Sequence, residues 1–99
     1  MRVAVVLHII SLLEIKSSTR RVLLFEVDGD LITALDEDIV SIADMNWLSL
    51  WLLGKRVDKL YCDGLTKSGK RYLENAGITV HSLKHIKEHP VLEALLLKD

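Results

Sequence analysis

The sequence predicts a small α/β domain with a mixed β-sheet, and three stretches of the chain support this. Residues 2–10 are β-branched and apolar on both faces, which is typical of a central strand covered on each side. Asp28 and Gly29 separate two strand-like runs and favour a tight hairpin turn. Residues 57–80 then have the pattern of a strand, a glycine-bearing turn, a helix and a second strand.

The composition is that of a folded globule. The chain has 99 residues, which allows one domain with one core. Hydrophobic residues make up 49% and charged residues 27% of the chain, so enough apolar surface is available for burial and the composition is not that of a disordered protein. We therefore expect residues 1–99 to form a single domain.

Charge and cysteine content exclude several classes of partner. The 13 basic and 14 acidic residues are interspersed, so no basic stripe predicts binding to nucleic acid. The longest charge-free apolar run, residues 3–13, is shorter than the ~18 to 20 residues that cross a bilayer, so no membrane association is expected. The lone Cys62 cannot form an internal disulfide and the N-terminus lacks a signal-peptide cleavage site, which together favour the cytoplasm.

The first half of the chain predicts three strands and a helix. After the strand at 2–10, residues 14–20 are polar and are expected to form a surface loop. Residues 21–27 and 30–35 flank the Asp-Gly turn and should be antiparallel neighbours. Apolar residues recur at helical spacing over 41–53, and Gly54 follows as a C-cap.

The second half predicts a parallel strand pair. We expect strands at 57–62 and 78–81, joined by a helix at 67–75 that ends before Gly77. A helical crossover makes such strands parallel. Pro90 divides the tail into a short helical turn and a terminal amphipathic helix that closes one face of the sheet.

Two groups of side chains have competing interpretations. Trp47 and Trp51 lie four residues apart and could form a ligand platform, but core packing or a dimer contact is the favoured explanation. Acidic residues also gather around the hairpin and its exit, where a solvated edge is favoured over catalysis. These residues are Asp28, Asp30, Asp36, Glu37 and Asp38.

Cys62 lies where open α/β sheets bind their ligands, at the carboxyl end of a parallel strand. A thiolate there is a soft ligand for an iron-sulfur centre. The favoured alternative is a buried cysteine that packs as a small hydrophobe. Of the histidines, only His8 is expected to neighbour Cys62 across the sheet, whereas His81, His85 and His89 are spaced by four along a possible helical face.

The segment GLTKSGKR, residues 64–71, follows a strand, opens a helix and matches a phosphate-binding P-loop up to its last position. Arg71 stands where a Ser or Thr would hold Mg²⁺, so nucleotide hydrolysis is not expected. A weaker hypothesis remains, in which the N–H groups at the helix start bind an anion together with Lys67, Lys70 or Arg71.

The element order and several segments resemble the dinitrogenase iron-molybdenum cofactor biosynthesis proteins, the small nitrogenase accessory-factor domains with a ribonuclease-H-like sheet. The matching segments are MRVAV, LLFEVDGDLI and, above all, VDKLYCDGLTKSGKRYLENAGITV. The resemblance implies a five-stranded mixed sheet whose first strand pairs with the second and fourth, with helices on both faces. It also implies cofactor binding or carriage instead of catalysis. Nuclease chemistry is not expected, because the first strand offers none of the carboxylates that two-metal nucleases need.

The sequence thus predicts a non-enzymatic binding or carrier domain for an iron-sulfur or iron-molybdenum type cluster, or a related anionic cofactor. Its expected partners are the cluster and its donor and acceptor proteins, with possible homo-oligomerisation. Cys62 and His8 are the candidate metal ligands, and the full set of candidate cofactor-binding residues is Cys62, Asp63, Gly64, Thr66, Lys67 and His8. The alternative is a degenerate family member that acts as a protein-interaction or dimerisation module, motivated by the apolar residues 7–13 and 91–97.

Overall fold

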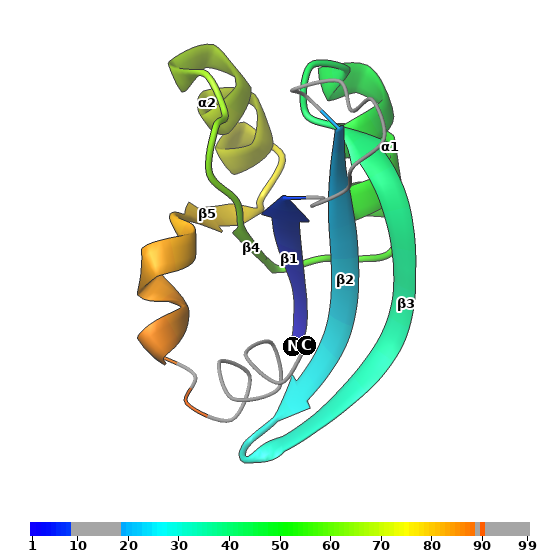
Figure 1. Cartoon of the computed structure of the whole chain (residues 1–99), viewed down its shortest axis with the longest axis vertical. Coiled ribbons are helices and arrows are strands. Elements are labelled where there is room, and N and C mark those ends of the chain that lie inside the picture. The colour runs from blue at the N-terminus through cyan, green and yellow to red at the C-terminus, as the bar shows by residue number, and fades with distance from the viewer. Residues whose placement is uncertain (9–18, 89, 91–99) are drawn as a thin grey trace.

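The computed structural model describes residues 1–8, 19–88 and 90 of the chain. Over these residues it forms five strands, two α-helices and a 3₁₀ helix (Figure 1). In chain order they are β1 (Arg2–His8), β2 (Thr19–Asp28), β3 (Leu31–Ser41), α1 (Met45–Gly54), β4 (Lys59–Tyr61), α2 (Lys67–Asn75), β5 (Thr79–His81) and the 3₁₀ helix η1 (Leu83–Glu88).

The strands form one mixed sheet in the order β3-β2-β1-β4-β5. β1 lies at its centre, antiparallel to β2 and parallel to β4, so that Val5 stands opposite Leu23 on one side and Tyr61 on the other. β2 and β3 are antiparallel, and β4 and β5 are parallel. The predicted mixed five-stranded sheet, with its first strand between the second and the fourth, is therefore confirmed.

Apolar side chains cover both faces of the sheet because strand residues alternate in direction. On one face Ala4, Val6 and Leu60 pack against both α-helices, through Leu48 of α1 and Leu73 of α2. On the other face, a smaller cluster packs against the 3₁₀ helix; it consists of Val3, Val5, Phe25, Val27 and Tyr61, with Leu83 and Ile86 of η1 beside it. Both α-helices thus share one face, and η1 covers part of the opposite one.

Three of the predicted boundaries are wrong. β2 begins at Thr19, inside the predicted loop, and β3 continues to Ser41 because it pairs with β2 along its whole length. A bulge opposite Leu24 and Phe25 absorbs Leu35 as an extra residue. The helix then begins at Met45 instead of residue 41, since Asp44 caps it by accepting a 3.0 Å hydrogen bond from the N–H of Trp47.

Other predicted boundaries agree closely or lie outside the described residues. The helix at 67–75 is confirmed residue for residue, and the short helical turn before Pro90 is η1. The part of the predicted strand beyond His8, the loop residues 14–18 and the terminal helix after Pro90 lie outside the residues that the structure describes.

The acidic residues of β3 attach this edge strand to the rest of the molecule. Asp36 forms an ion pair with Lys55, Glu37 pairs with Arg21 of β2, and Asp38 accepts a hydrogen bond from Trp51 Nε1. The three distances are 2.7, 2.8 and 3.1 Å. Trp51 packs against the core as predicted, whereas Trp47 remains largely exposed.

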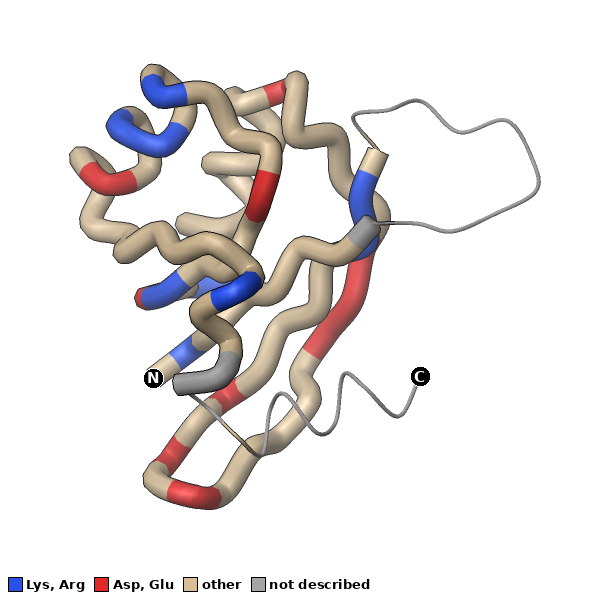
Figure 2. Tube along the Cα trace, turned by 60° about the vertical axis from the view of Figure 1, so that its left-hand side comes forward, with Lys and Arg blue, Asp and Glu red and all other residues tan. Residues whose placement is uncertain are grey.

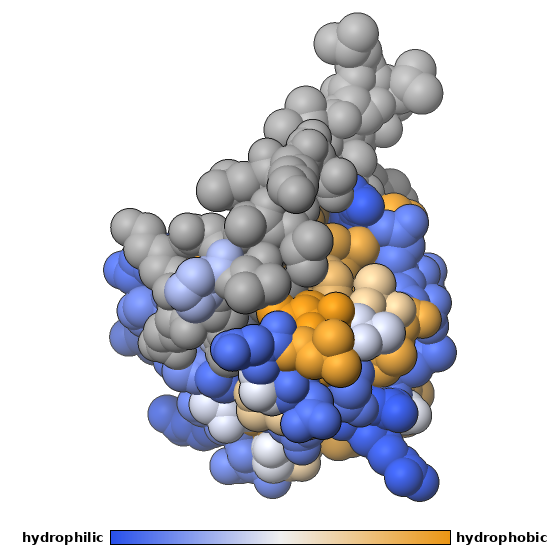
Figure 3. Space-filling model, turned by 90° about the horizontal axis from the view of Figure 1, so that it is seen from below, coloured by the Kyte–Doolittle hydropathy of each residue, from blue (hydrophilic) through white to orange (hydrophobic). Residues whose placement is uncertain are grey.

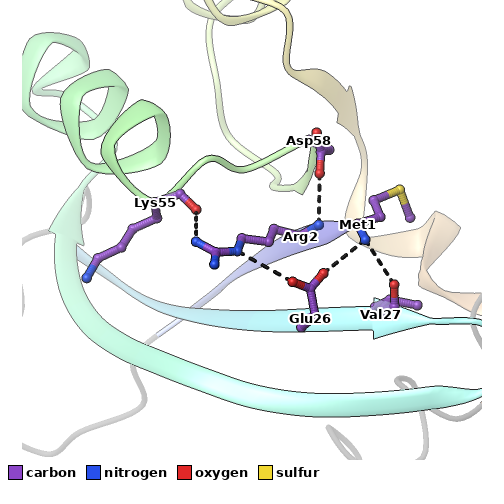
Figure 4. Close-up of polar contacts among 6 residues, drawn as sticks. All are labelled: Met1, Arg2, Glu26, Val27, Lys55 and Asp58. Atoms are coloured by element: carbon purple, nitrogen blue, oxygen red, sulfur yellow. Dashed lines mark hydrogen bonds and ion pairs between the residues drawn. The ribbon is translucent and has the colours of Figure 1, made fainter.

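The start of β1 is held by a polar network (Figure 4). The ammonium of Met1 donates to Glu26 Oε2 at 2.9 Å, and the guanidinium of Arg2 donates to the carbonyl oxygen of Lys55 at 2.8 Å. The backbone N–H of Arg2 donates to Asp58 Oδ2 at 2.9 Å. These contacts join β1 to β2 and to the connection between α1 and β4.

The surface carries both charges and apolar patches. Figure 2 shows acidic and basic residues interspersed along the described trace, without a continuous basic stripe over that part of the chain. Figure 3 shows apolar residues gathered in one area of the face seen from below. In the described part of the chain, no helix is long and apolar enough to cross a membrane.

Candidate functional site: a pocket beyond β4 and β5

A pocket of about 220 Å³ lies beyond the carboxyl ends of the parallel strands β4 and β5. Open α/β sheets bind their ligands at this kind of position. The pocket is lined by Cys62, Asp63, Gly64, Leu65, Lys70, Val80, His81 and Ser82. Its walls therefore come from the loop between β4 and α2, from α2 itself, and from the end of β5 with the turn that follows.

The loop after β4 requires glycine at its turn. Gly64 has a φ of +87°, a backbone conformation that L-residues rarely adopt. A Cβ atom there would lie 3.1 Å from Ile42 Cδ1 and 3.7 Å from Arg20 Nη2. The absence of a side chain thus permits both the turn and its close approach to the neighbouring elements.

Asp63 connects the two walls of the pocket. Its Oδ1 accepts hydrogen bonds from Ser82 Oγ at 2.7 Å and from the N–H of Leu83 at 3.1 Å. The loop after β4 is therefore tied to the start of η1. In this geometry Asp63 positions the pocket walls, which is a role that the sequence did not indicate.

Cys62 is a buried, protonated thiol at neutral pH. Burial, with a smaller contribution from the charge of Asp63, raises its pKa to about 12, and Arg20 acts in the opposite direction. Its Sγ lies 3.4 Å from the carbonyl oxygen of Asp63, to which the thiol donates. A protonated thiol binds metal only after it loses its proton, so Cys62 is not poised as a free thiolate.

The histidine that neighbours Cys62 is His81. The N–H of Cys62 donates to the carbonyl oxygen of His81 at 2.9 Å, and both residues line the pocket. The prediction that only His8 would neighbour Cys62 is therefore wrong, because the predicted parallel pairing of the two strands itself places His81 beside Cys62. His8 stands opposite Arg20 of β2 in the sheet register, and its side chain lies outside the described part of the structure.

The ring of His81 belongs to an aromatic group on the sheet. Its centroid is 5.5 Å from that of Tyr61 and 6.0 Å from that of His85, with the two histidine rings edge to face. Over residues 1–8, 19–88 and 90, no group of three or more His, Cys, Asp or Glu side chains is placed to hold a metal ion. The described residues therefore lack a complete ligand set for a resident metal ion.

Two predicted site residues lie beside the pocket instead of in its lining. Thr66 is the N-cap of α2, and its Oγ1 accepts a 3.0 Å hydrogen bond from the N–H of Gly69. Lys67 is exposed on the first turn of α2, and neither residue lines the pocket. Of the cations considered for anion binding, Lys70 is the one in the lining.

Arg20 is a further residue that the sequence did not single out. It is only 9% exposed, and its Nη1 donates to the carbonyl oxygen of Thr19 at 2.9 Å. It lies close enough to Cys62 to lower the pKa of that thiol. The sequence placed Arg20 in a polar surface loop, and no local pattern indicates that β2 begins before it.

Comparisons with known proteins support the fold. No family model and no curated protein matches the sequence. The structure is similar to the crystal structure of PH0822, with a TM-score of 0.54 and 14% sequence identity, over 83% of this chain and 78% of that one. It is also similar to the Fowlpox virus resolvase, which was solved in complex with its substrate Holliday junction DNA.

The match to the resolvase has the same TM-score of 0.54 and the same identity of 14%, over 83% of this chain and 59% of the resolvase chain. Such distant likeness shows the fold and nothing further. Together with the strand order, it places this protein in the ribonuclease-H-like class of α/β folds, as the sequence predicted.

Proposed function

We propose that this protein is a small, non-enzymatic binding or carrier domain that takes up an anionic cofactor in the pocket beyond β4 and β5. The cargo that we favour is an iron-sulfur or iron-molybdenum type cluster. The observation that carries the proposal is the position and lining of the pocket, which combines Cys62 and His81 with the positive charge of Lys70 at the carboxyl ends of two parallel strands.

The chemistry of the lining suits a cargo better than a resident metal ion. A single ion needs several protein ligands, and the described residues offer no group of three. A cluster brings ligands of its own, so one or two contacts from the chain suffice to hold it. Because Cys62 must lose a proton to bind metal, uptake should strengthen as the pH rises.

The resolvase likeness does not lead us to propose nuclease activity. Two-metal nucleases hold their ions with carboxylates. The central strand β1, with the sequence RVAVVLH, contains no Asp or Glu. The shared fold alone carries no catalytic claim.

The test is an anaerobic titration of the protein with an iron-sulfur or iron-molybdenum cluster donor, followed by visible spectra and metal analysis. Wild type is compared with Cys62→Ala and Lys70→Glu, and Lys67→Glu is the matched control because it makes the same charge change outside the pocket lining. Stoichiometric uptake by wild type and Lys67→Glu, lost in the other two variants, supports the proposal. Absence of uptake by wild type, or equal uptake by all four, contradicts it.

A second candidate function is that of an interaction module without ligand. The observation that favours it is the exposed apolar surface of α1, where Trp47, Leu50 and Leu53 all face solvent. Failure of the cluster titration, together with self-association of the protein, would make this the working function.

A further inference from the structure

Helix α1 buries a polar side chain and exposes apolar ones, which is the reverse of what a solvent-facing helix does. Its sequence, MNWLSLWLLG, is apolar on nearly every side, a pattern typical of a helix that is covered all round. Ser49 is only 2% exposed, and its Oγ has no hydrogen-bond partner among the described residues. Leu50, the next residue, is 72% exposed. The outward face is therefore unsuited to water.

Three apolar side chains form a stripe on the outward face, where Asn46 is exposed as well. Trp47 is 40% exposed and Leu53 is 46% exposed, and they lie one turn before and one turn after Leu50. Leu50 is thus the centre of the stripe. A partner helix would cover all three side chains if it crossed α1 at Leu50.

The two ends of α1 carry opposite charges. Asp44 caps the amino end of α1, and Arg56 follows the carboxyl end. Arg56 has a φ of +57°, the left-handed conformation in which glycine is usual after a helix, and it is the only non-glycine residue with positive φ in the described part of the chain. An arginine kept in this strained position suggests that its side chain has a role.

We propose that α1 is the homodimerisation surface of this protein, pairing antiparallel with α1 of a second copy about a two-fold axis through Leu50. Residues whose numbers are equally far from 50 then meet. Leu50 packs on its own equivalent, Trp47 packs on Leu53 of the second copy, and Asp44 meets Arg56 of the second copy twice over. The antiparallel arrangement also opposes the two helix dipoles favourably.

Pairing through the edge strand is disfavoured by charge. β3 is an open edge of the sheet, but Asp36 stands at its middle with Glu37 and Asp38 beside it. A symmetric antiparallel pairing of two β3 strands would bring these acids together. The helix surface is therefore the better symmetric interface, and its modest size makes the dimer reversible.

The inference is independent of whether the pocket binds a cofactor, and the test needs no ligand. Sedimentation velocity across a concentration series should show a monomer–dimer equilibrium for wild type. Leu50→Glu should weaken dimerisation by about 100-fold or more, because it places two like charges at the centre of the interface. Leu31→Glu is the matched control, since Leu31 is also an exposed leucine but lies on β3, and it should leave the equilibrium unchanged.

A charge exchange tests the antiparallel geometry. Arg56→Asp and Asp44→Arg should each weaken self-association by about tenfold, because each homodimer then opposes like charges at both ends. Mixing the two variants should restore dimers, since every contact between unlike copies becomes attractive again. Asp44→Ala reports the separate effect of losing the helix cap, with folding checked by circular dichroism.

Each outcome decides the proposal. The proposal is supported if Leu50→Glu loses the dimer while Leu31→Glu keeps it, and if mixing the two charge variants restores dimers. A wild-type protein that stays monomeric at the highest concentrations overturns it, as does a dimer that Leu50→Glu leaves intact. A dimer lost in Leu50→Glu but not recovered by mixing overturns the antiparallel geometry.

Discussion

The N–H of Cys62 donates a 2.9 Å hydrogen bond to the carbonyl oxygen of His81, which joins the carboxyl ends of β4 and β5 beside the pocket. This one contact joins the backbones of two pocket-lining residues that are far apart in the sequence. It follows from the parallel pairing of two short strands, and that pairing depends on the helical crossover through α2. The pocket is thus a direct product of the sheet topology.

The buried thiol predicts a stability that falls at high pH. Burial raises the pKa of Cys62 from an ordinary value of 9.0 to about 12, so the folded state holds its proton where the unfolded state releases it. The contribution is fully present below pH 9 and is lost as the pH rises toward 12. Urea unfolding measured at several alkaline pH values should show this loss, and Cys62→Ala should flatten it. An identical slope in both proteins would show that Cys62 is not responsible.

Replacing Asp63 should make Cys62 easier to deprotonate. The carboxylate charge raises the pKa of the thiol, so Asp63→Asn should lower that pKa while retaining an acceptor for Ser82 and Leu83. Thiolate absorbance followed during a pH titration measures the change directly. Ser82→Ala, which removes one hydrogen bond and no charge, is the control and should have the smaller effect. An unchanged Cys62 pKa in Asp63→Asn would contradict the electrostatic explanation.

Gly64→Ala should destabilise the protein more than Gly29→Ala. Both glycines have positive φ, which costs an alanine about 1 to 2 kcal/mol. At Gly29 nothing lies within 4 Å of the added Cβ, whereas at Gly64 it would lie 3.1 Å from Ile42 Cδ1. We expect a further loss of about 1 kcal/mol at Gly64 from this crowding. Chemical unfolding of the two variants compares these costs, and equal losses would mean that Ile42 moves aside freely.

The contact between Asp36 and Lys55 predicts that the Asp36 carboxyl titrates below its ordinary pKa. The hydrogen bond from Lys55 and the N–H of Glu37 lower the pKa of Asp36 below its ordinary value of 3.8. A lowered pKa contributes stability above the ordinary value, and this contribution is lost as the pH falls through the folded-state pKa. Carboxyl chemical shifts in an NMR pH titration should show this, with a rise toward 3.8 in Lys55→Ala. A wild-type Asp36 that titrates at its ordinary value would contradict the contact.

The elements with local signals were predictable from the sequence. Thr66, the amphipathic residues that follow it and Gly77 indicate both ends of α2, and the structure has the predicted range. The acids at 36–38 resemble the exit of a hairpin, so the end of β3 was missed. Pairing with β2 and contacts to α1 keep these residues in a strand, and both are tertiary effects that no local pattern contains.

The candidate site was predictable only in part. The strand end and the glycine turn placed Cys62, Asp63 and Gly64 in the pocket lining, where the structure has them. His81 was considered as part of a helical histidine face, although the predicted parallel strand pair already places it beside Cys62. Thr66 was predicted only as a cofactor-binding residue, and the structure shows that its hydroxyl caps α2.

Paramagnetic NMR on the protein with a bound cluster would test the proposed cargo site most directly. A paramagnetic iron-sulfur cluster broadens the amide signals of residues close to it, so it reports where the cargo binds. We expect the signals of Cys62, Gly64 and Ser82, which line the pocket, to broaden first on addition of a cluster donor. Those of Leu31 and Leu50 should remain sharp. Broadening that spares the pocket, or no change in any signal, would contradict the proposed carrier site.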